Sequence, residues 1–300
     1  MAHQQNRFDI HQAITDQIVT AMETAGAARM PWTCSRGDSL ARPVNIATGN
    51  PYNGVNVLSL WVSARAADYP SNTWGTYKQW QDRGCQVRKG ERSSLIVFYK
   101  ILAVEETDTE TGESAPGERM LARASRVFNG AQVEGVETAP ETLPEAPLFD
   151  PIAQAEVFAA ATGARIEEGG DVACYMPGPD LVRMPDRRRF TGTETSDPAE
   201  AFYAVLCHEL VHWSGVDRRL DRDLSGRFGD ASYAMEELVA ELGAAFLCAD
   251  LGIASEPRED HASYIRTWLE VLKGDKKAIF SAAAKASQAA SWLMAKGEGG

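Results

Sequence analysis

The sequence predicts an α+β protein built from an N-terminal α+β domain, residues 1–145, and a mainly helical domain with a small sheet, residues 146–300. These are called the front half and the back half below. The chain has 300 residues, about twice the length of a typical single domain. Its composition, 44% hydrophobic and 24% charged, excludes a disordered or fibrous chain. An acidic, proline-containing stretch at about 134–149 is typical of a linker and separates the two halves.

Helix and strand patterns alternate in the front half. Apolar residues at helical spacing predict a first helix at 8–26, and glycine and asparagine mark a loop at 45–56. We then expect helices at about 55–67 and 75–83, strands at about 84–89 and 94–103, an acidic surface loop or hairpin excursion at 104–118, and strands within 120–133.

Helical patterns dominate the back half. Asp197, Pro198 and Glu200 fit the start of one helix as a capping box with proline at the first position, and Gly215 fits its end. The expected elements are a helix at about 151–163, strands at about 171–175 and 180–184, and helices at about 198–213, 232–251, 259–273 and 276–296.

The sequence also indicates a cellular compartment. No stretch approaches the ~20 consecutive apolar residues that cross a bilayer, and the N-terminus lacks the apolar region of a signal peptide. We therefore expect a cytoplasmic protein with no membrane partner. Five scattered cysteines without a Cys-x-x-Cys pair argue against a disulfide scaffold or an all-cysteine zinc site.

Charge is unevenly distributed along the chain. Residues 1–100 contain eleven Lys and Arg against seven Asp and Glu, a net charge of +4, whereas residues 101–300 contain 19 against 35, a net charge of −16. Basic and aromatic residues alternate in the front half, and single-stranded nucleic acid binds to such mixtures of cations and flat rings. We predict single-stranded nucleic acid as the partner, with these candidate contacts: Tyr52, Trp74, Tyr77, Lys78, Gln79, Arg83, Arg88, Lys89 and Arg92.

The strongest chemical signal is the run His208-Glu209-Leu210-Val211-His212. Two histidines four residues apart on a helix point from one face and can bind the same metal ion. Glu209 between them is then placed to act as general base. The alternative, two surface histidines beside a solvated glutamate, fits less well because the neighbouring residues are apolar.

A third metal ligand is expected on the helix at 232–251. Glu237 and Glu241 share a face with small apolar residues, where carboxylates are costly unless they are paired with a cation. We assign Glu237 as the ligand and Glu241 as the carboxylate that orients a ligating histidine. Glu236 competes with Glu237 for the ligand role. The donor set favours Zn²⁺, but Mn²⁺ or another divalent ion fits as well.

The back half resembles the zincin-like metallopeptidases, which follow the His-Glu-x-x-His helix with a Glu-x-x-Ala-Glu element, here Glu237 to Glu241. The resemblance implies zinc-dependent peptide hydrolysis. In such enzymes an edge strand aligns the substrate, and residues 180–184 stand at the expected place. Tyr175 and Tyr233 are both candidates for the hydrogen-bond donor that stabilises the oxyanion.

Read as a whole, the chain is similar to the ArdC antirestriction family, whose N-terminal domain also occurs in some plasmid primases. The matching front-half elements are Pro43-x-Asn45…Thr48-Gly49-x-x-Tyr52-x-Gly54-x-Asn56, Trp74-x-Thr76-Tyr77-Lys78-Gln79, Gly84-x-x-Val87-x-Lys89-Gly90-Glu91 and Val127-Phe128-Asn129-x-x-Gln132-x-Glu134-Gly135. In the back half they are His-Glu-Leu-x-His-Trp and Tyr264-Ile265-x-x-Trp268-Leu269-x-x-Leu272. The resemblance implies a plasmid-encoded protein that binds single-stranded DNA and protects incoming conjugative DNA from host restriction.

Three functions remain to be distinguished. The first is a DNA-bound metallopeptidase with an unidentified protein substrate, for which a host restriction component is a candidate. The second is a protein that shields single-stranded DNA and whose metal domain is structural or non-proteolytic. The third is an acidic DNA mimic that inhibits restriction enzymes, but mimicry requires no metal-site geometry.

Overall fold

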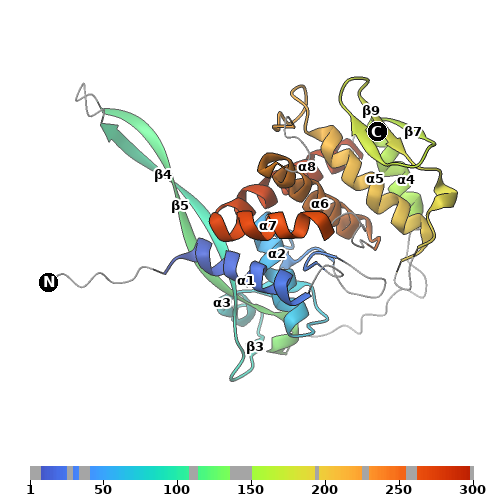
Figure 1. Cartoon of the computed structure of the whole chain (residues 1–300). Coiled ribbons are helices and arrows are strands. Elements are labelled where there is room, and N and C mark those ends of the chain that lie inside the picture. Colours follow the sequence, from blue (N-terminus) through green and yellow to red (C-terminus); the bar gives the residue numbers. More distant parts are fainter. Residues whose placement is uncertain are drawn as a thin grey trace.

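The computed structural model describes residues 8–25, 30–33, 41–107, 114–135, 151–192, 196–224, 230–254 and 262–297 (Figure 1). Its mixture of helices and small sheets confirms the predicted α+β class. The front half contains α1 Ile10–Ala25, β1 Val44–Asn45, α2 Val55–Ala66, β2 Thr73–Gly75, α3 Tyr77–Gln81, β3 Gln86–Val87, β4 Ser94–Thr107, β5 Ser114–Asn129 and β6 Val133–Glu134. Short strands β1 and β2 are additions to the predicted set. The predicted linker lies outside the described residues except for Glu134 and Gly135.

The back half is mainly helical. Its elements are α4 Pro151–Ala161, β7 Arg165–Glu168, β8 Cys174–Met176, β9 Leu181–Met184, α5 Pro198–Ser214, α6 Ala231–Leu251, α7 Ala262–Gly274 and α8 Ala278–Gly297. Strand β7 was not expected, and the other elements agree with the prediction to within a few residues. Within the described part of the chain, no helix combines the length and the apolar character that crossing a bilayer requires.

A long hairpin is the most extended feature of the front half. The strand order of its sheet is β1-β2-β5-β4, and β4 pairs antiparallel with β5 from Ser94↔Val127 out to Thr107↔Ser114. The hairpin projects from the body of the protein (Figure 1). The acidic segment predicted as a loop or hairpin excursion therefore continues both strands at 104–107 and 114–118, while 108–113 lies outside the described residues.

Helix α2 protects the outer edge of β4. The Asn56 side chain accepts from the Val97 N–H and donates to the Val97 carbonyl, both at 2.8 Å, and Ser59 Oγ donates to the Leu95 carbonyl at 2.8 Å. Strand β4 ends the sheet order, so these backbone groups have no partner strand. Side chains of α2 satisfy them instead and block edge-to-edge association.

One hydrophobic core runs through both halves. The ring of Trp61 on α2 lies 5.7 Å from that of Phe246 on α6, and the ring of Trp32 lies 6.3 Å from that of Trp268 on α7. A polar contact also joins the two halves, since Thr15 Oγ1 on α1 donates to the Lys276 carbonyl, between α7 and α8, at 2.8 Å. The front half is thus packed directly on the helices of the back half (Figure 1).

The edge protection can be tested with Asn56→Ala. The substitution leaves the Val97 N–H and carbonyl without their side-chain partner, so we expect the free energy of unfolding to fall by about 2 kcal/mol. Thermal unfolding measures the effect. Asn53→Ala, at an exposed position three residues earlier, should change stability by less than about 0.5 kcal/mol. Equal melting temperatures for the two variants would contradict the role of Asn56.

Candidate metal centre

Helix α5 positions the two histidines. Asp197 Oδ1 accepts from the N–H groups of Ala199 and Glu200, both at 2.9 Å, and Glu200 Oε2 accepts from the Asp197 N–H at 2.9 Å. This confirms the predicted capping box, with proline at the start of the helix. The fixed start and regular helix bring the imidazoles of His208 and His212 to one face, with ring centroids 4.8 Å apart.

Helix α6 supplies the carboxylates, and a glycine lets it approach α5 closely. A Cβ placed on Gly243 would lie 2.7 Å from Val211 Cγ2 on α5, a separation that packed atoms do not tolerate. Any larger residue would therefore push the two helices apart. The close packing brings two consecutive turns of α6, with Glu236, Glu237 and Glu241, beside the histidine face.

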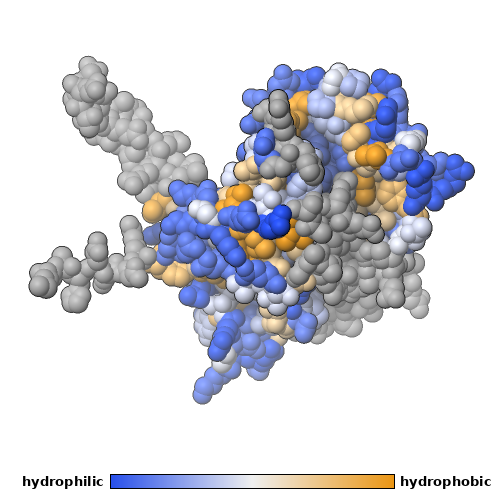
Figure 2. All heavy atoms as spheres, in the orientation of Figure 1, coloured by the Kyte–Doolittle hydropathy of each residue, from blue (hydrophilic) through white to orange (hydrophobic). Residues whose placement is uncertain are grey.

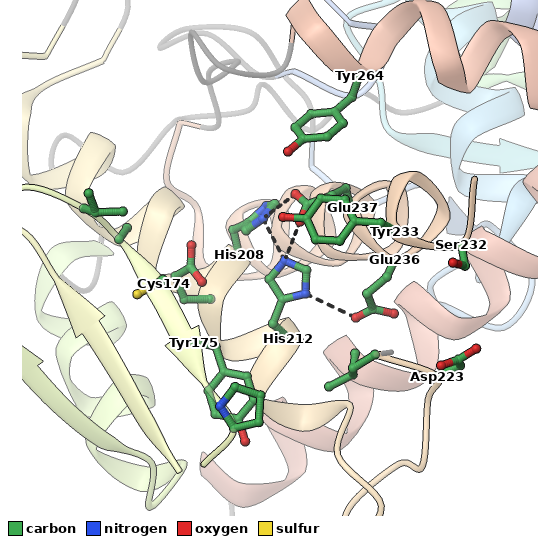
Figure 3. A pocket seen from close by; sticks show the side chains of 15 residues that line it. Cys174, Tyr175, His208, His212, Asp223, Ser232, Tyr233, Glu236, Glu237 and Tyr264 are labelled. Carbon is green, nitrogen blue, oxygen red and sulfur yellow. Dashed lines mark hydrogen bonds and ion pairs between the residues drawn. The ribbon is translucent and has the colours of Figure 1, made fainter. Parts of the chain in front are cut away.

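His208, His212 and Glu237 converge on one point (Figure 3). The two Nε2 atoms are 3.1 Å apart, Glu237 Oε2 lies 3.5 Å from His208 Nε2, and Glu237 Oε1 lies 3.5 Å from His212 Nε2. Burial raises the pKa of the Glu237 carboxyl, but the hydrogen bond with His208 and the charge that the two imidazoles can hold outweigh it and lower the pKa to about 2. Glu237 is therefore a carboxylate at neutral pH.

The orientation of the imidazoles fits a bound cation. His212 Nδ1 lies 3.2 Å from Glu236 Oε1, and His208 Nδ1 lies 3.7 Å from Glu241 Oε2. A carboxylate only accepts, so His212 Nδ1 carries the hydrogen toward Glu236, and the Nε2 atom of His212 faces the point where His208 Nε2 and Glu237 meet. The three groups together form a site that could hold a metal ion. Donors around a tetrahedral ion with bonds of 2.0–2.1 Å lie about 3.3 Å apart, which agrees with the observed separations.

Glu236, the alternative third ligand, is held differently. It accepts from Arg222 Nη2 at 2.8 Å and from Arg222 Nε at 3.1 Å, and Arg222 also donates to the Val211 carbonyl at 2.6 Å. Burial raises the pKa of Glu236, but hydrogen bonds with His212 and Arg222 outweigh it and lower that pKa. Glu236 thus faces the Nδ1 side of His212, away from the point where the Nε2 atoms meet. Sequence reasoning missed Arg222 because it follows α5 in a loop without a motif.

Glu209 lies in a cavity of about 370 Å³ together with the three converging residues. Its side chain belongs to α5 and is buried, 3% exposed. Tyr233 on α6 and Tyr264 on α7 line the same cavity. A buried carboxylate, two imidazoles and a cavity large enough for a short peptide segment are the parts that metal-assisted hydrolysis needs.

The strand beside the cavity is not the predicted one. Sheet order β7-β9-β8 puts β9, Leu181–Met184, in the centre, paired on both sides, so the segment 180–184 cannot pair with a substrate. The edge strand is β8, whose Cys174 and Tyr175 line the cavity. Strand order depends on contacts far apart in the sequence, which the local pattern does not contain.

The two tyrosines considered as oxyanion donors differ in their surroundings. The Tyr175 hydroxyl donates to Asp180 Oδ1 at 2.8 Å, and burial together with this bond raises its pKa to about 12. Burial, the charge of Glu237 and contact with Tyr264 raise the pKa of Tyr233 even further. Tyr233 therefore keeps its proton and lies beside the three converging residues (Figure 3).

The nucleic-acid candidates of the front half fall into three groups. Trp74 is fully buried and Tyr52 is 6% exposed, so these rings belong to the core and are closed to bases in this structure. Gln79 completes the capping box of α3 with Thr76. The others lie at the surface around α3 and β3: Tyr77, 46% exposed, and Lys78, Arg83, Arg88, Lys89 and Arg92.

Sequence reasoning missed an exposed apolar patch at the base of the hairpin. Phe98 is 50% exposed and Leu121 is 37% exposed. The register pairs Phe98 with Arg123 and Lys100 with Leu121, so two apolar and two basic side chains alternate on one face. Hydrophobic surface appears where the hairpin leaves the body (Figure 2). The run of apolar residues before Phe98 hid this alternation in the sequence.

Two family models match the chain. Residues 8–128 match the N-terminal domain of anti-restriction factor ArdC, and residues 153–285 match a zincin-like metallopeptidase. Two crystal structures of the antirestriction protein ArdC from plasmid R388 are similar over nearly the whole chain. The metal-free form has a TM-score of 0.77 at 35% identity and covers 97% of this chain and 98% of the other. The Mn(II)-bound form has a TM-score of 0.75 at 34% identity and covers 97% and 99%.

Curated relatives extend the similarity. An uncharacterised protein of Sinorhizobium fredii, y4eC, is 48% identical over 297 residues, which are 97% of this chain and 94% of that protein. The DNA primase TraC of Escherichia coli is 33% identical over 300 residues, which are 95% of this chain but 27% of the primase. The same fold thus occurs alone and as part of a larger protein.

Asp180 forms a polar cluster with Tyr175, Arg218 and Arg219. The contribution of this cluster to stability can be tested by changing the pH. The hydrogen bond from Arg219 lowers the pKa of Asp180 well below its ordinary value; burial opposes this, and Arg218 and Tyr175 add to it. The ionised carboxylate therefore stabilises the fold above its unfolded pKa of about 4, and this stability is lost as the pH falls. Asp180→Asn should lower the melting temperature at pH 7 by a few degrees, on the order of 1 kcal/mol given its partial exposure.

The difference between wild type and Asp180→Asn should shrink as the pH falls below about 4. Asparagine tolerates the positive φ of 52° at this position, so the turn itself is kept. The exposed Asp217→Asn serves as control at both pH values. A difference that is equally large at pH 7 and pH 3 would contradict the role of the ionised carboxylate.

Proposed function

The chain belongs to the ArdC family of antirestriction proteins, and on that premise we propose that it binds single-stranded DNA through its front half and hydrolyses peptide bonds at a divalent-metal site in its back half. In this role it protects incoming conjugative DNA from host restriction in the cytoplasm. The observation on which the proposal rests is the convergence of His208, His212 and Glu237 beside the buried Glu209.

His208, His212 and Glu237 hold the ion through two imidazole nitrogens and one carboxylate. This donor set is typical of catalytic zinc and also accepts Mn²⁺, and the R388 relative has a Mn(II)-bound structure. When bound, the ion acts as a Lewis acid that polarises the scissile carbonyl and makes water more acidic. Glu236 accepts a hydrogen bond from His212 Nδ1, and Glu241 Oε2 lies 3.7 Å from His208 Nδ1, so the two carboxylates orient the rings.

Glu209 performs the proton transfers. Its carboxylate accepts a proton from the attacking water and delivers it to the nitrogen of the leaving amine. Tyr233 stays protonated and donates a hydrogen bond to the oxygen on which negative charge develops. Strand β8, at the edge of its sheet and beside the cavity, pairs with the extended substrate.

The front half binds the DNA strand at the base of the hairpin. Phe98 offers an exposed ring for a base, and its cross-strand neighbour Arg123 and the nearby Lys100 offer positive charge for phosphates. Tyr77 and Lys89, which line a second hollow of about 580 Å³, extend the contact surface around α3 and β3.

A second function, shielding of DNA without proteolysis, is favoured by one observation. The chain matches about a quarter of the length of the DNA primase TraC, a protein named for work on DNA and not for proteolysis. In that case the metal site stabilises the fold, and protection depends on DNA contacts alone.

Glu209→Gln separates the two functions. Removing a general base should slow hydrolysis by about 10²-fold or more, while the affinity for Zn²⁺ or Mn²⁺ stays within a few-fold because Glu209 is not a ligand. The assay measures cleavage of unfolded casein with and without single-stranded DNA, and metal binding by calorimetry. The exposed Glu270→Gln is the control and should behave as wild type.

Restriction protection is then measured with the same two variants. Loss of protection in Glu209→Gln alone supports the peptidase. Full protection by Glu209→Gln would show that proteolysis is not the protective activity and would favour DNA shielding.

The DNA surface is tested with Phe98→Ala and Arg123→Gln. Loss of a stacked base should weaken binding of a thymidine oligonucleotide on the order of tenfold, and loss of one phosphate contact should reduce the slope of log K against log salt by about 0.7. Fluorescence anisotropy at several salt concentrations measures both. Arg165→Gln, an exposed arginine on β7, is the control. Unchanged affinity in both hairpin variants would place the DNA elsewhere.

A further inference from the structure

A tryptophan of the front half reaches the metal centre of the back half. Trp32 is buried, 1% exposed, and its Nε1–H donates to Glu241 Oε1 at 3.2 Å. The other oxygen of the same carboxylate, Oε2, lies 3.7 Å from His208 Nδ1. One carboxylate therefore connects the indole of Trp32 to a histidine whose Nε2 faces the proposed metal position.

The hydrogen-bonding capacity of the indole and the carboxylate determines which of them donates. An indole N–H can only donate, and a carboxylate can only accept. The bond to Oε1 limits rotation of the Glu241 carboxylate and so keeps Oε2 toward His208. Glu241 is 6% exposed, and a hydrogen bond to a buried charge is stronger than one in water.

The indole is itself held in place from α2. Arg65 donates to the carbonyls of Met30 and Thr33, at 2.9 and 2.5 Å, and the Thr33 N–H and hydroxyl both bond to the Met30 carbonyl. These bonds close the turn 30–33, in which Trp32 lies. On its far side, the indole lies against the ring of Trp268 on α7, with centroids 6.3 Å apart.

We propose that Trp32 is a positioning residue of the metal centre: the front half holds Glu241, and through it His208, in the geometry that binds the ion. This inference rests on the metal site proposed above. It makes metal affinity a property of both halves together, since the turn 30–33 and α2 belong to the half that binds DNA.

Trp32→Phe tests the inference, with Trp61→Phe as a matched control. Trp61 is equally buried, 3% exposed, packs on Phe246 of α6, and donates its N–H to the Ala41 carbonyl at 3.3 Å, far from any proposed ligand. Loss of a group that orients a metal ligand typically costs about tenfold or more in affinity. Trp32→Phe should therefore weaken Zn²⁺ binding on the order of tenfold, measured by competition with a chelating dye, and Trp61→Phe should not.

A double-mutant cycle separates positioning from general packing. With Glu241→Ala, Trp32 has no carboxylate to hold, so adding Trp32→Phe should not weaken Zn²⁺ binding further. The visible absorption of bound Co²⁺ provides a second readout, because it reports ligand geometry: it should change in Trp32→Phe and stay as in wild type in Trp61→Phe. Additive losses of affinity in the cycle would overturn the inference.

The remaining outcomes are also decisive. If wild type binds Zn²⁺ and Trp32→Phe binds it equally well, the role of Trp32 is wrong and the metal site stands. If wild type binds no divalent ion, the metal site is wrong and the inference falls with it. Should Trp32→Phe fail to fold, Arg65→Lys replaces it, since a weaker hold on the turn 30–33 should lower affinity in the same direction.

Discussion

The structure depends on one electrostatic feature: two imidazole nitrogens and a carboxylate lie within 3.5 Å of one another and could hold a metal ion. The surrounding architecture brings these groups together. Gly243 lets α6 approach α5, and the capping box of Asp197 and Glu200 fixes where α5 begins. Two further carboxylates, Glu236 and Glu241, face the outer nitrogens of the histidines.

A common hydrophobic core joins the two halves. Helices α1 and α2 pack on α6, α7 and α8, and ring contacts such as that between Trp61 and Phe246 cross between the halves. Within the described residues, a structural change in the front half can therefore be transmitted to α6 through directly packed side chains. The base of the β4–β5 hairpin belongs to this core through Ile96, Val97 and Val127, while the outer part of the hairpin projects from the body (Figure 1).

Local patterns predicted what depends on local geometry. The spacing of His208, Glu209 and His212 and the capping residues of α5 follow from helical periodicity, so both could be found in the sequence. The sequence did not decide between Glu236 and Glu237 as the third ligand, because the two are adjacent on one helix. Arg222, in the loop after α5, pairs with Glu236 and leaves Glu237 as the carboxylate that faces the Nε2 atoms. The central place of β9, the burial of Trp74 and the contact of Trp32 with Glu241 likewise result from packing between distant segments.

Anomalous diffraction from crystals grown with Mn²⁺ or Zn²⁺ tests the central claim most directly. We expect a strong peak within bonding distance, about 2.0–2.2 Å, of His208 Nε2, His212 Nε2 and a carboxylate oxygen of Glu237. We also expect Glu236 to remain paired with Arg222. A peak bonded to Glu236 while Glu237 points away, or no peak between the two imidazoles, would contradict it.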